Sequence, residues 1–374
     1  MSQDGEAENL KAEEQSAEDA DDSIAVIGGG LIGLSIAWEL ARAGWRSTVY
    51  EKGRFGGEAS WAAAGMLSPG GEVEGPSALA SLAIESRDLY GRFVENLEQA
   101  SGLGIDYQEC GGLDLAYSPE ELRVLEERAR VQAAAGIESR PVTAAHIVAF
   151  WPRVRREGLA GGRFYPKDGV VNPQELVTAL AKACRRAGIQ IHENCAAARV
   201  EVFEKGATVE SCRGTAWHDA VVIAAGAWSS DLEMRGAPAI PRAEPVKGHL
   251  IGYRQPEHTC ATIVRHRGTY LLQRANGLLI AGASVEHVGF DRELRDEIAA
   301  GLAGEAAFVF PHLAETAPSE VWVGFRPESD GLHIGAWGSK RLLLAYGHYR
   351  NGILLAPVTA ARIAAEINAN LQTR

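Results

Sequence analysis

Cysteine is scarce in this sequence of 374 residues. The five cysteines are Cys110, Cys184, Cys195, Cys212 and Cys260, and no two of them form a C-x-x-C pair. An odd number of scattered cysteines argues against a disulfide framework and against a structural zinc site. We therefore expect buried thiols and no bound metal.

Long apolar runs and basic clusters are also missing. No stretch has the roughly 18 consecutive apolar residues of a membrane-spanning helix, and the N-terminus lacks the basic start and apolar core of a secretory signal. No basic stripe with interleaved aromatic residues is present. These absences predict a soluble, cytoplasmic protein that binds neither membranes nor nucleic acid.

Residues 1–22 have almost no large apolar side chains. They hold nine acidic residues against Lys11, and therefore carry eight of the chain's twelve net negative charges. Such a segment cannot bury enough apolar surface to offset the entropy cost of ordering. We expect it to be a disordered acidic tail.

A glycine-rich turn between two short apolar strands stands out in the remainder. The residues Ile24–Ile27 predict a buried strand, and Gly28-x-Gly30-x-x-Gly33 opens a segment with helical periodicity. Gly28 permits the tight turn, Gly30 lets a pyrophosphate approach the backbone, and Gly33 allows close packing of helix and strand. The pattern predicts a dinucleotide site with its phosphates at the helix N-terminus.

Glu51 ends the second predicted strand, 18 residues after Gly33. A carboxylate at this place accepts hydrogen bonds from a ribose diol and repels a 2′-phosphate. The adenosine half of the ligand is therefore expected to be NAD-like or FAD-like. The fingerprint itself does not say which nucleotide is bound.

The small residues of segment 60–67, Ser-Trp-Ala-Ala-Ala-Gly-Met-Leu, would let a backbone lie against a flat ring. We expect its amides to face the reactive end of a cofactor. The alternative is an alanine-rich loop that only fills space between domains.

The order of the other predicted elements indicates two interleaved domains. Antiparallel strands dominate from 241 to 281, a helix is expected near 291–302, and a final helix is expected to begin near Asn351 and run to Asn368. The fold class is α/β with an α+β substrate domain. The Rossmann-like nucleotide domain is expected at 23–76, 171–235 and 318–370, and the antiparallel substrate domain at 77–170 and 236–317.

Four motifs together resemble the glycine oxidases of thiamine biosynthesis, which belong to the D-amino-acid oxidase family. They are the Gly28 fingerprint, Ala62–Met66, Ala224–Trp228 and Gly347–Pro357. The resemblance implies FAD as cofactor, O2 as electron acceptor, H2O2 as product, a small amino acid or amine as substrate, and a homo-oligomer. It leaves open a D-amino-acid or sarcosine-type oxidase or dehydrogenase, and a flavoprotein without turnover.

The resemblance also implies roles for individual residues. Arg326 would clamp the substrate carboxylate, Tyr270 would supply a hydroxyl, and Arg350 would lie beside flavin and substrate, with Val285 nearby. The expected cofactor-binding residues are Gly28, Gly30, Leu31, Ile32, Gly33, Glu51, Lys52, Ser60, Ala63, Ala64, Gly65, Met66, Val200, Ala225, Gly226, Trp228, Asn351, Gly352, Ile353 and Leu354.

His249 and His348 are candidates for a catalytic base. Hydride transfer from an unprotonated amine needs no such base. The sequence also departs from the family pattern at Gln273, at Val285 and in the Pro327–Gly331 turn with Glu328. We expect these positions to lie near the substrate, and the departures open the possibility of a larger or N-substituted amino acid.

Overall fold

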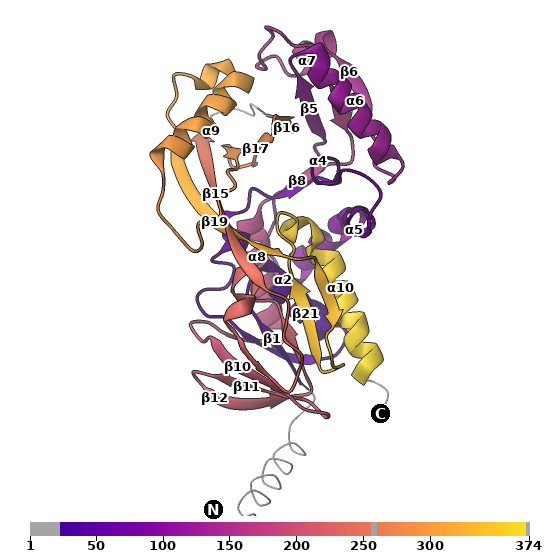
Figure 1. The fold of residues 1–374 in the computed structure, drawn as a ribbon, viewed down its shortest axis with the longest axis vertical. Helices are drawn as coiled ribbons and strands as arrows, with labels where there is room; N and C mark the ends of the chain where they lie inside the picture. Colours follow the sequence, from indigo (N-terminus) through magenta and orange to yellow (C-terminus); the bar gives the residue numbers. More distant parts are fainter. Residues whose placement is uncertain (1–22, 256–259, 372–374) are drawn as a thin grey trace, which may run out of the picture.

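The computed structural model of the chain describes residues 23–255 and 260–371. Figure 1 shows an elongated molecule whose lower part holds β1, α2 and α10 and whose upper part holds α6, α7 and α9. The acidic segment 1–22, which we expect to be disordered, lies outside the described residues.

A six-stranded sheet forms the base of the lower part, with the strand order β20-β21-β13-β1-β2-β9. Its strands are β1 (Ser23–Ile27), β2 (Arg46–Tyr50), β9 (Gln190–His192), β13 (Ala220–Ile223), β20 (His333–Ala336) and β21 (Leu342–Tyr346). All are parallel except β20. Parallel sheets are buried on both faces, which explains the unbroken apolar run at Ile24–Ile27.

Three helices cover one face of this sheet: α2 (Leu31–Arg42), α8 (Pro173–Arg186) and α10 (Gly352–Leu371). A fourth, α5 (Ala78–Ser101), packs against α8 and α10. Asn172 caps α8 through Gln174 N at 3.2 Å, as the Asn-Pro pair predicts. α10 is long and apolar enough to cross a membrane by length and composition. Its apolar residues pack against α2 and α5, as in the core helix of a globular protein.

A four-stranded sheet covers the other face, with the order β12-β11-β10-β14. It comprises β10 (Ala197–Val202), β11 (Ala207–Ser211), β12 (Gly214–His218) and β14 (Glu233–Arg235). The β10–β11 hairpin also corrects the cysteine prediction. It pairs Ala197 with Ser211, and Cys195 and Cys212 beyond this pair form a disulfide with Cα atoms 5.5 Å apart.

The other three cysteines are free thiols. Cys184 and Cys260 are buried, and Cys110 is partly buried. The spacing of the cysteines alone could not distinguish these two groups, because the disulfide depends on how the hairpin pairs.

The upper part is built on an eight-stranded sheet with the order β19-β15-β18-β17-β16-β5-β7-β6. Its strands are β5 (Gly112–Ala116), β6 (Arg140–Thr143), β7 (Gly161–Tyr165), β15 (Ala243–Arg254), β16 (Ile263–His266), β17 (Thr269–Gln273), β18 (Leu278–Gly282) and β19 (Glu320–Ser329). Every pairing is antiparallel except that of β16 with β5. Helix α9 (Asp296–Val309) packs on this sheet, further along the chain than predicted.

Strands β15 and β19 have 12 and 10 residues and extend from the upper part into the lower part (Figure 1). Pro327, which we expect in a turn, lies inside β19 opposite Pro245. β19 is the edge strand of its sheet, and an edge strand tolerates proline because one side of its backbone needs no partner. This length carries Arg326 to the junction of the two sheets.

The remaining elements are mostly short, and α6 and α7 lie at the top of the upper part (Figure 1). These remaining elements are β3 (Met66–Leu67), β4 (Tyr107–Gln108), β8 (Gly169–Val171), α3 (Ala59–Ala62), α4 (Pro69–Glu72), α6 (Pro119–Ala133), α7 (Ala144–Phe150), η1 (Gly226–Asp231) and η2 (Pro311–Leu313). Segments of the six-stranded and eight-stranded sheets alternate along the chain. The domain boundaries given above remain predictions.

Candidate functional site

The glycine fingerprint forms the turn between β1 and α2. Gly28 has a φ of +111° and donates its amide to Tyr50 O at 2.8 Å. A Cβ at Gly28 would lie 2.4 Å from Ala224 O, and a Cβ at Gly33 would lie 1.9 Å from Gly28 O. Both positions therefore require glycine: the first for its dihedral angle and space, the second for the packing of α2 on β1.

Glu51 is buried beside this turn. One carboxylate oxygen accepts the Gly29 amide and the other accepts the Gly53 amide, each at 2.7 Å. Each oxygen keeps a second lone pair that a ligand hydroxyl can use. The carboxylate thus fixes the loops on both sides of the nucleotide position.

A cavity of about 410 Å³ extends from Gly28 and Glu51 to Tyr270, Arg326 and Arg350. Most of the residues expected from the sequence line it. The lining includes Gly28, Gly30, Leu31, Ile32, Glu51, Lys52, Ser60, Ala63, Ala64, Gly65, Met66, Ala225, Gly226, Trp228, Asn351, Gly352 and Ile353. Gly33, Val200, Leu354 and Val285 lie outside the lining.

These four residues are outside for different reasons. Gly33 and Leu354 pack inside the helical layer, and Val200 is fully buried between the six-stranded and four-stranded sheets. Val285 is half exposed. Glu72 also lines the cavity. The sequence does not predict this, because a single acidic residue among glycines has no local signature.

The small-residue loop 62–66 is held from behind by the upper sheet. Trp322 Nε1 donates to Ala62 O at 2.9 Å, and Arg274 Nη2 donates to Ala63 O at 3.0 Å. Gly65 has a φ of +100°, and a Cβ there would meet Val171 O at 1.9 Å. The loop is therefore tightly packed on its outer side and lines the cavity on its inner side.

Arg326 and Tyr270 define the end of the cavity away from Glu51. Arg326 donates from Nη1 to Ser284 O at 2.9 Å, and its guanidinium covers Gly248, where a Cβ would come within 2.5 Å of Nη2. Burial lowers the pKa of Arg326, yet an arginine stays charged in proteins. Burial raises the pKa of Tyr270 and keeps its hydroxyl protonated.

Within the described residues, no carboxylate forms an ion pair with Arg326. Arg350, by contrast, is paired with Glu72, with Nε to Oε2 at 3.0 Å and Nη2 to Oε1 at 3.2 Å. Burial alone would lower the pKa of Arg350, but the Glu72 carboxylate outweighs it and the pKa is raised. Arg326 is thus the cation at this end that can take an added carboxylate.

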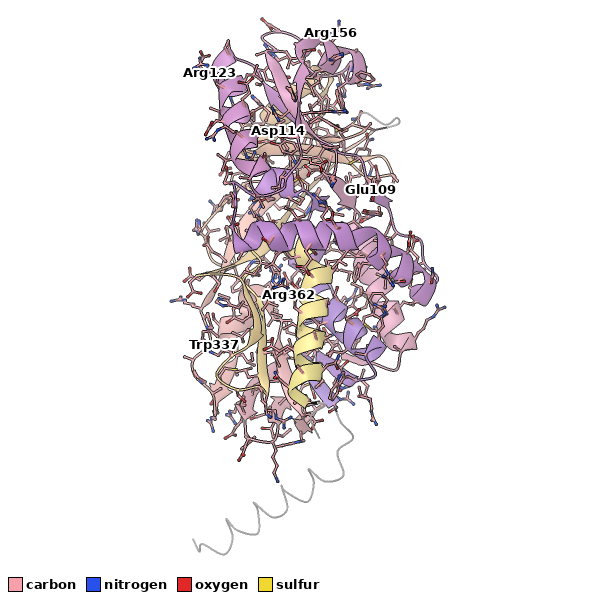
Figure 2. All side chains as sticks on the ribbon, turned by 90° about the vertical axis from the view of Figure 1, so that its right-hand side faces the viewer. Glu109, Asp114, Arg123, Arg156, Trp337 and Arg362 are labelled. Atoms are coloured by element: carbon pink, nitrogen blue, oxygen red, sulfur yellow. A yellow bond between two sulfur atoms is a disulfide. The ribbon has the colours of Figure 1, made fainter. Side chains whose placement is uncertain are left out.

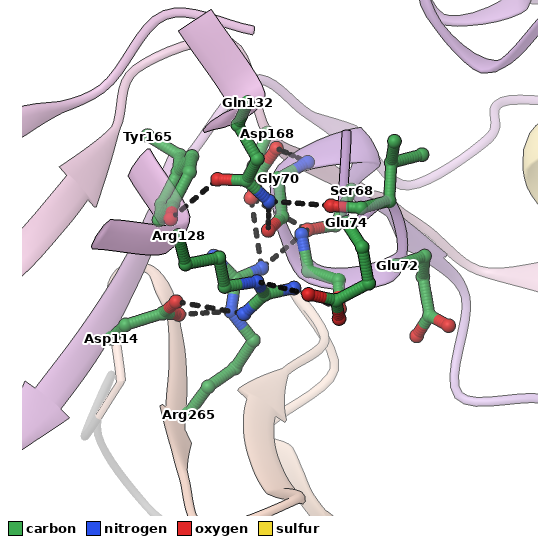
Figure 3. A network of polar contacts seen from close by, with 12 residues as sticks. Ser68, Gly70, Glu72, Glu74, Asp114, Arg128, Gln132, Tyr165, Asp168 and Arg265 are labelled. Atoms are coloured by element: carbon green, nitrogen blue, oxygen red, sulfur yellow. Dashed lines mark hydrogen bonds and ion pairs between the residues drawn. The ribbon is translucent and has the colours of Figure 1, made fainter. Parts of the chain in front are cut away.

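Glu72 is the last residue of α4, and side chains of the upper part hold the backbone of this short helix (Figure 3). Ser68 Oγ accepts the Gly71 amide at 3.0 Å as N-cap. Gln132 Nε2 donates to Gly70 O at 3.0 Å, and Arg128 Nη2 donates to Gly71 O at 3.0 Å. Contacts from elements other than α4 thereby fix the position of Glu72.

A buried ionic cluster lies beneath α4 (Figure 3). Arg265 on β16 pairs with Asp114 and with Asp168, the latter from Nη1 to Oδ2 at 2.8 Å. The same Nη1 contacts Ser68 Oγ, which donates to Asp168 Oδ2 at 2.6 Å. The cluster connects the eight-stranded sheet to the start of α4.

The first turn of α10 is anchored by α5, which crosses it in Figure 2. Ser86 Oγ donates to Leu354 O at 2.7 Å, and Tyr90 OH donates to Ile353 O at 2.9 Å. Arg362, labelled in Figure 2, pairs with Glu85 of α5 at 2.9 Å. These contacts set the position at which the free amides of α10 meet the cavity.

The structure argues against His249 as a base. It is fully buried outside the cavity lining, its Nδ1 contacts Glu286 Oε1 at 2.7 Å, and its Nε2 accepts the Arg295 amide at 3.0 Å. His348 does line the cavity, with Nε2 3.0 Å from Thr359 Oγ1. Burial lowers its pKa to about 3, which keeps it neutral at physiological pH.

Of the positions that depart from the family pattern, Pro327 lines the cavity, whereas Gln273, Val285 and Glu328 do not, contrary to our expectation for these three. Gln273 is buried and accepts the Cys260 amide at 3.0 Å. Glu328 contacts His287 at 3.6 Å, and Val285 is half exposed. For Glu328 the reason is that β19 continues as a strand where a turn was expected.

The residues present fit FAD. The glycine turn leaves room for a pyrophosphate. In the loop 62–66 every side chain before Met66 is small, and the cavity continues past this loop to an arginine that can bind an anion. A nucleotide alone would leave the region between Ala64 and Arg326 unfilled.

Comparison with known proteins places these features in context. The sequence profile of the DAO family, described as FAD dependent oxidoreductase, matches residues 23–367. Glycine oxidase of Geobacillus kaustophilus (strain HTA426) is 34% identical over 345 residues, which are 91% of each chain. The bifunctional protein ThiO/ThiG of Synechocystis sp. is 34% identical over 350 residues, which are 91% of this chain and 51% of that protein.

Solved structures agree. The crystal structure of glycine oxidase from Geobacillus kaustophilus matches with a TM-score of 0.86 and 31% identity, covering 93% of this chain and 95% of the other. L-proline dehydrogenase from P. horikoshii matches with a TM-score of 0.83 and 21% identity, covering 93% of this chain and 94% of the other. The second likeness concerns the fold alone.

Proposed function

Because this chain belongs to the DAO family of FAD-dependent oxidoreductases, we propose that it oxidises glycine or a related small or N-substituted amino acid. FAD is its cofactor. In the proposed reaction the amino acid, O2 and water give an oxo acid, H2O2 and ammonia, or the corresponding amine where the nitrogen is substituted, with glyoxylate as the oxo acid from glycine. The relatives named glycine oxidase support glycine as the first substrate to test.

The observation that carries this proposal is the partly buried Arg326 at the end of the cavity opposite Glu51, which pairs with no carboxylate in the described part of the chain. A guanidinium offers two parallel donors that match a carboxylate. Tyr270, in the same lining, supplies a neutral hydroxyl that can donate to the same group. An amino acid held by these two side chains would present its Cα to the space beside Ala64.

Bound FAD supplies an electron-poor ring that accepts a hydride from the substrate Cα and passes the electrons to O2. The chain's own contribution is orientation and electrostatics. Arg326 fixes the carboxylate, the loop 62–66 forms one wall, and the Glu72–Arg350 pair fixes a second guanidinium without adding net charge. With His249 engaged on both nitrogens and His348 neutral, the amine would react in its unprotonated form.

Anaerobic mixing of the yellow holoprotein with glycine, sarcosine and D-alanine tests this proposal. We expect at least one of them to bleach the flavin absorption, and admission of air to restore it with one H2O2 for each amine oxidised. Bleaching without peroxide in air would indicate a dehydrogenase. No bleaching by any small amino acid would contradict the proposal.

A cytoplasmic location and a homo-oligomeric state complete the proposal. The oligomer is proposed by analogy with the family. Size-exclusion chromatography with light scattering measures it directly, and a monomer at micromolar concentration would contradict it.

A further inference from the structure

Arg274, directly after β17, is a buried cation whose burial is only partly offset by the charges of Asp106, Glu175 and Glu320. Its side chain is 3% exposed, its Nη2 donates to Ala63 O at 3.0 Å, and its Nε has no hydrogen-bond partner. Within residues 23–255 and 260–371, no carboxylate forms an ion pair with it. Burial lowers its pKa, yet an arginine keeps its charge in proteins. The chain therefore maintains a positive charge behind the loop 62–66.

The peptide bond between Ala63 and Ala64 lies between this charge and the cavity. The bond is trans, so its N–H points away from its C=O. The carbonyl faces Arg274, and both alanines line the cavity. Across the described residues, the Ala64 amide donates to no protein acceptor. The amide is thus available to a ligand in the cavity.

Ala64 lies at the substrate end of the cavity. It packs in one apolar cluster with Leu250 and Tyr270, whereas Glu51 and Gly28 lie at the other end of the cavity. A FAD molecule with its adenosine at Glu51 would place its ring beside Ala64. A ring that gains two electrons gains negative charge, and a polarised amide stabilises that charge.

We infer that Arg274 is a positioning residue that polarises the Ala63–Ala64 peptide and thereby raises the reduction potential of the bound flavin. A charged donor on the carbonyl strengthens the amide of the same peptide as a donor, because hydrogen bonds in series polarise one another. Arg274 acts through the peptide and does not itself line the cavity. The inference rests on the ring placement of the proposed function.

The test measures the potential of the bound flavin by equilibration with a reference dye. Arg274→Gln should shift the equilibrium between oxidised and reduced flavin about tenfold toward the oxidised form, which is about 30 mV for a two-electron couple. Arg274→Lys keeps a charged donor and should recover most of the difference. Arg267→Gln, which removes an exposed cation from the β16–β17 turn, should leave the potential unchanged.

Trp322→Phe separates this role from simple support of the loop. It removes the hydrogen bond from the neutral indole to Ala62 O, next to the hydrogen bond from the charged Arg274 to Ala63 O. We expect the potential of Trp322→Phe to stay near that of the wild type. Equal potentials in Arg274→Gln and the wild type would overturn the inference, and so would equal shifts in Arg274→Gln and Trp322→Phe.

A measurement on the unaltered holoprotein covers the case in which Arg274→Gln does not fold. The amide proton of Ala64 should move downfield in the NMR spectrum when the flavin is reduced, and an unmoved signal would overturn the inference. Failure of the proposed function looks different. In that case the wild type would bind no FAD, or its flavin would not be bleached by any small amino acid.

Discussion

At the scale of single residues, Arg326 is the side chain on which substrate binding depends most. Replacing it with lysine keeps the charge but loses the two parallel donors. Truncating one member of a buried charged pair costs about 2–5 kcal/mol, so we expect Arg326→Lys to raise KM at least about thirtyfold, with FAD content unchanged. Steady-state kinetics and the flavin-to-protein absorbance ratio measure both quantities.

Arg242→Lys is the matched control, because Arg242 is exposed and pairs with Glu244 at 3.0 Å on the surface. Its kinetics should match the wild type. Normal saturation of Arg326→Lys with substrate would place the carboxylate clamp elsewhere.

His218 predicts a stability change in mild acid. It is buried with its ring nitrogens 3.0 Å from Ser23 Oγ and Tyr50 OH, and burial lowers its pKa from 6.5 to about 4. The unfolded chain therefore binds a proton between pH 6.5 and pH 4 that the folded chain does not, and stability falls as the pH falls through this window. His218 should thereby reduce the free energy of unfolding by about 3 kcal/mol across this pH range.

Denaturant unfolding at several pH values measures this effect. His218→Gln should lose less stability than the wild type between pH 6.5 and pH 4, and part of the slope should remain because His348 is also held neutral. Parallel curves for the two proteins would show that His218 does not contribute.

At the scale of elements, the Arg265 cluster holds the start of α4 to the eight-stranded sheet. Removing one partner of a buried ion pair leaves an uncompensated charge, so Arg265→Met should cost about 3–5 kcal/mol of unfolding free energy. Adding Asp168→Asn should recover part of the loss, because it removes one of the stranded carboxylates. Denaturant unfolding of the single and double variants measures the coupling.

The control for the Arg265 and Asp168 variants is Arg123→Met, which removes an exposed ion pair with Glu120. It should change stability by less than about 0.5 kcal/mol. A similarly small change in Arg265→Met would show that the cluster does not contribute to stability.

The elements divide into those that local sequence predicts and those that it cannot. The Gly28 turn was predicted from residues within a few positions, and the adjacent residues Asn172 and Pro173 are likewise enough to explain the cap of α8. The Cys195–Cys212 disulfide, the Glu72–Arg350 pair and the length of β19 depend on contacts between distant segments. No periodicity or spacing within one segment contains that information, so these features needed the tertiary structure.

At the scale of the whole molecule, the cavity joins the two sheet systems through residues from both. FAD binds the folded chain, so excess FAD should raise the melting temperature of the apoprotein, with about 2.7 kcal/mol of stabilisation at a hundredfold excess over Kd. Gly30→Leu, whose side chain would enter the cavity near Ser60, should gain nothing and should purify colourless. Thermal melts with and without FAD measure the difference.

Gly301→Leu is the matched control for the added side chain. Gly301 lies in α9 and a Cβ there would meet no atom within 4 Å. This variant should bind FAD and respond to it as the wild type does. A fully yellow Gly30→Leu preparation would contradict the assignment of the glycine turn.

The pairing of Arg350 with Glu72 has a consequence for selectivity among substrates. The end of the cavity at Tyr270 contains the guanidiniums of Arg326 and Arg350 and the carboxylate of Glu72. With one substrate carboxylate bound, the two positive charges are balanced by two negative charges. A second substrate carboxylate would be an unbalanced negative charge in a buried site, and burying such a charge costs free energy. D-Aspartate should therefore be oxidised with a much lower kcat/KM than D-alanine, so that electroneutrality, in addition to size, selects which amino acids the enzyme accepts.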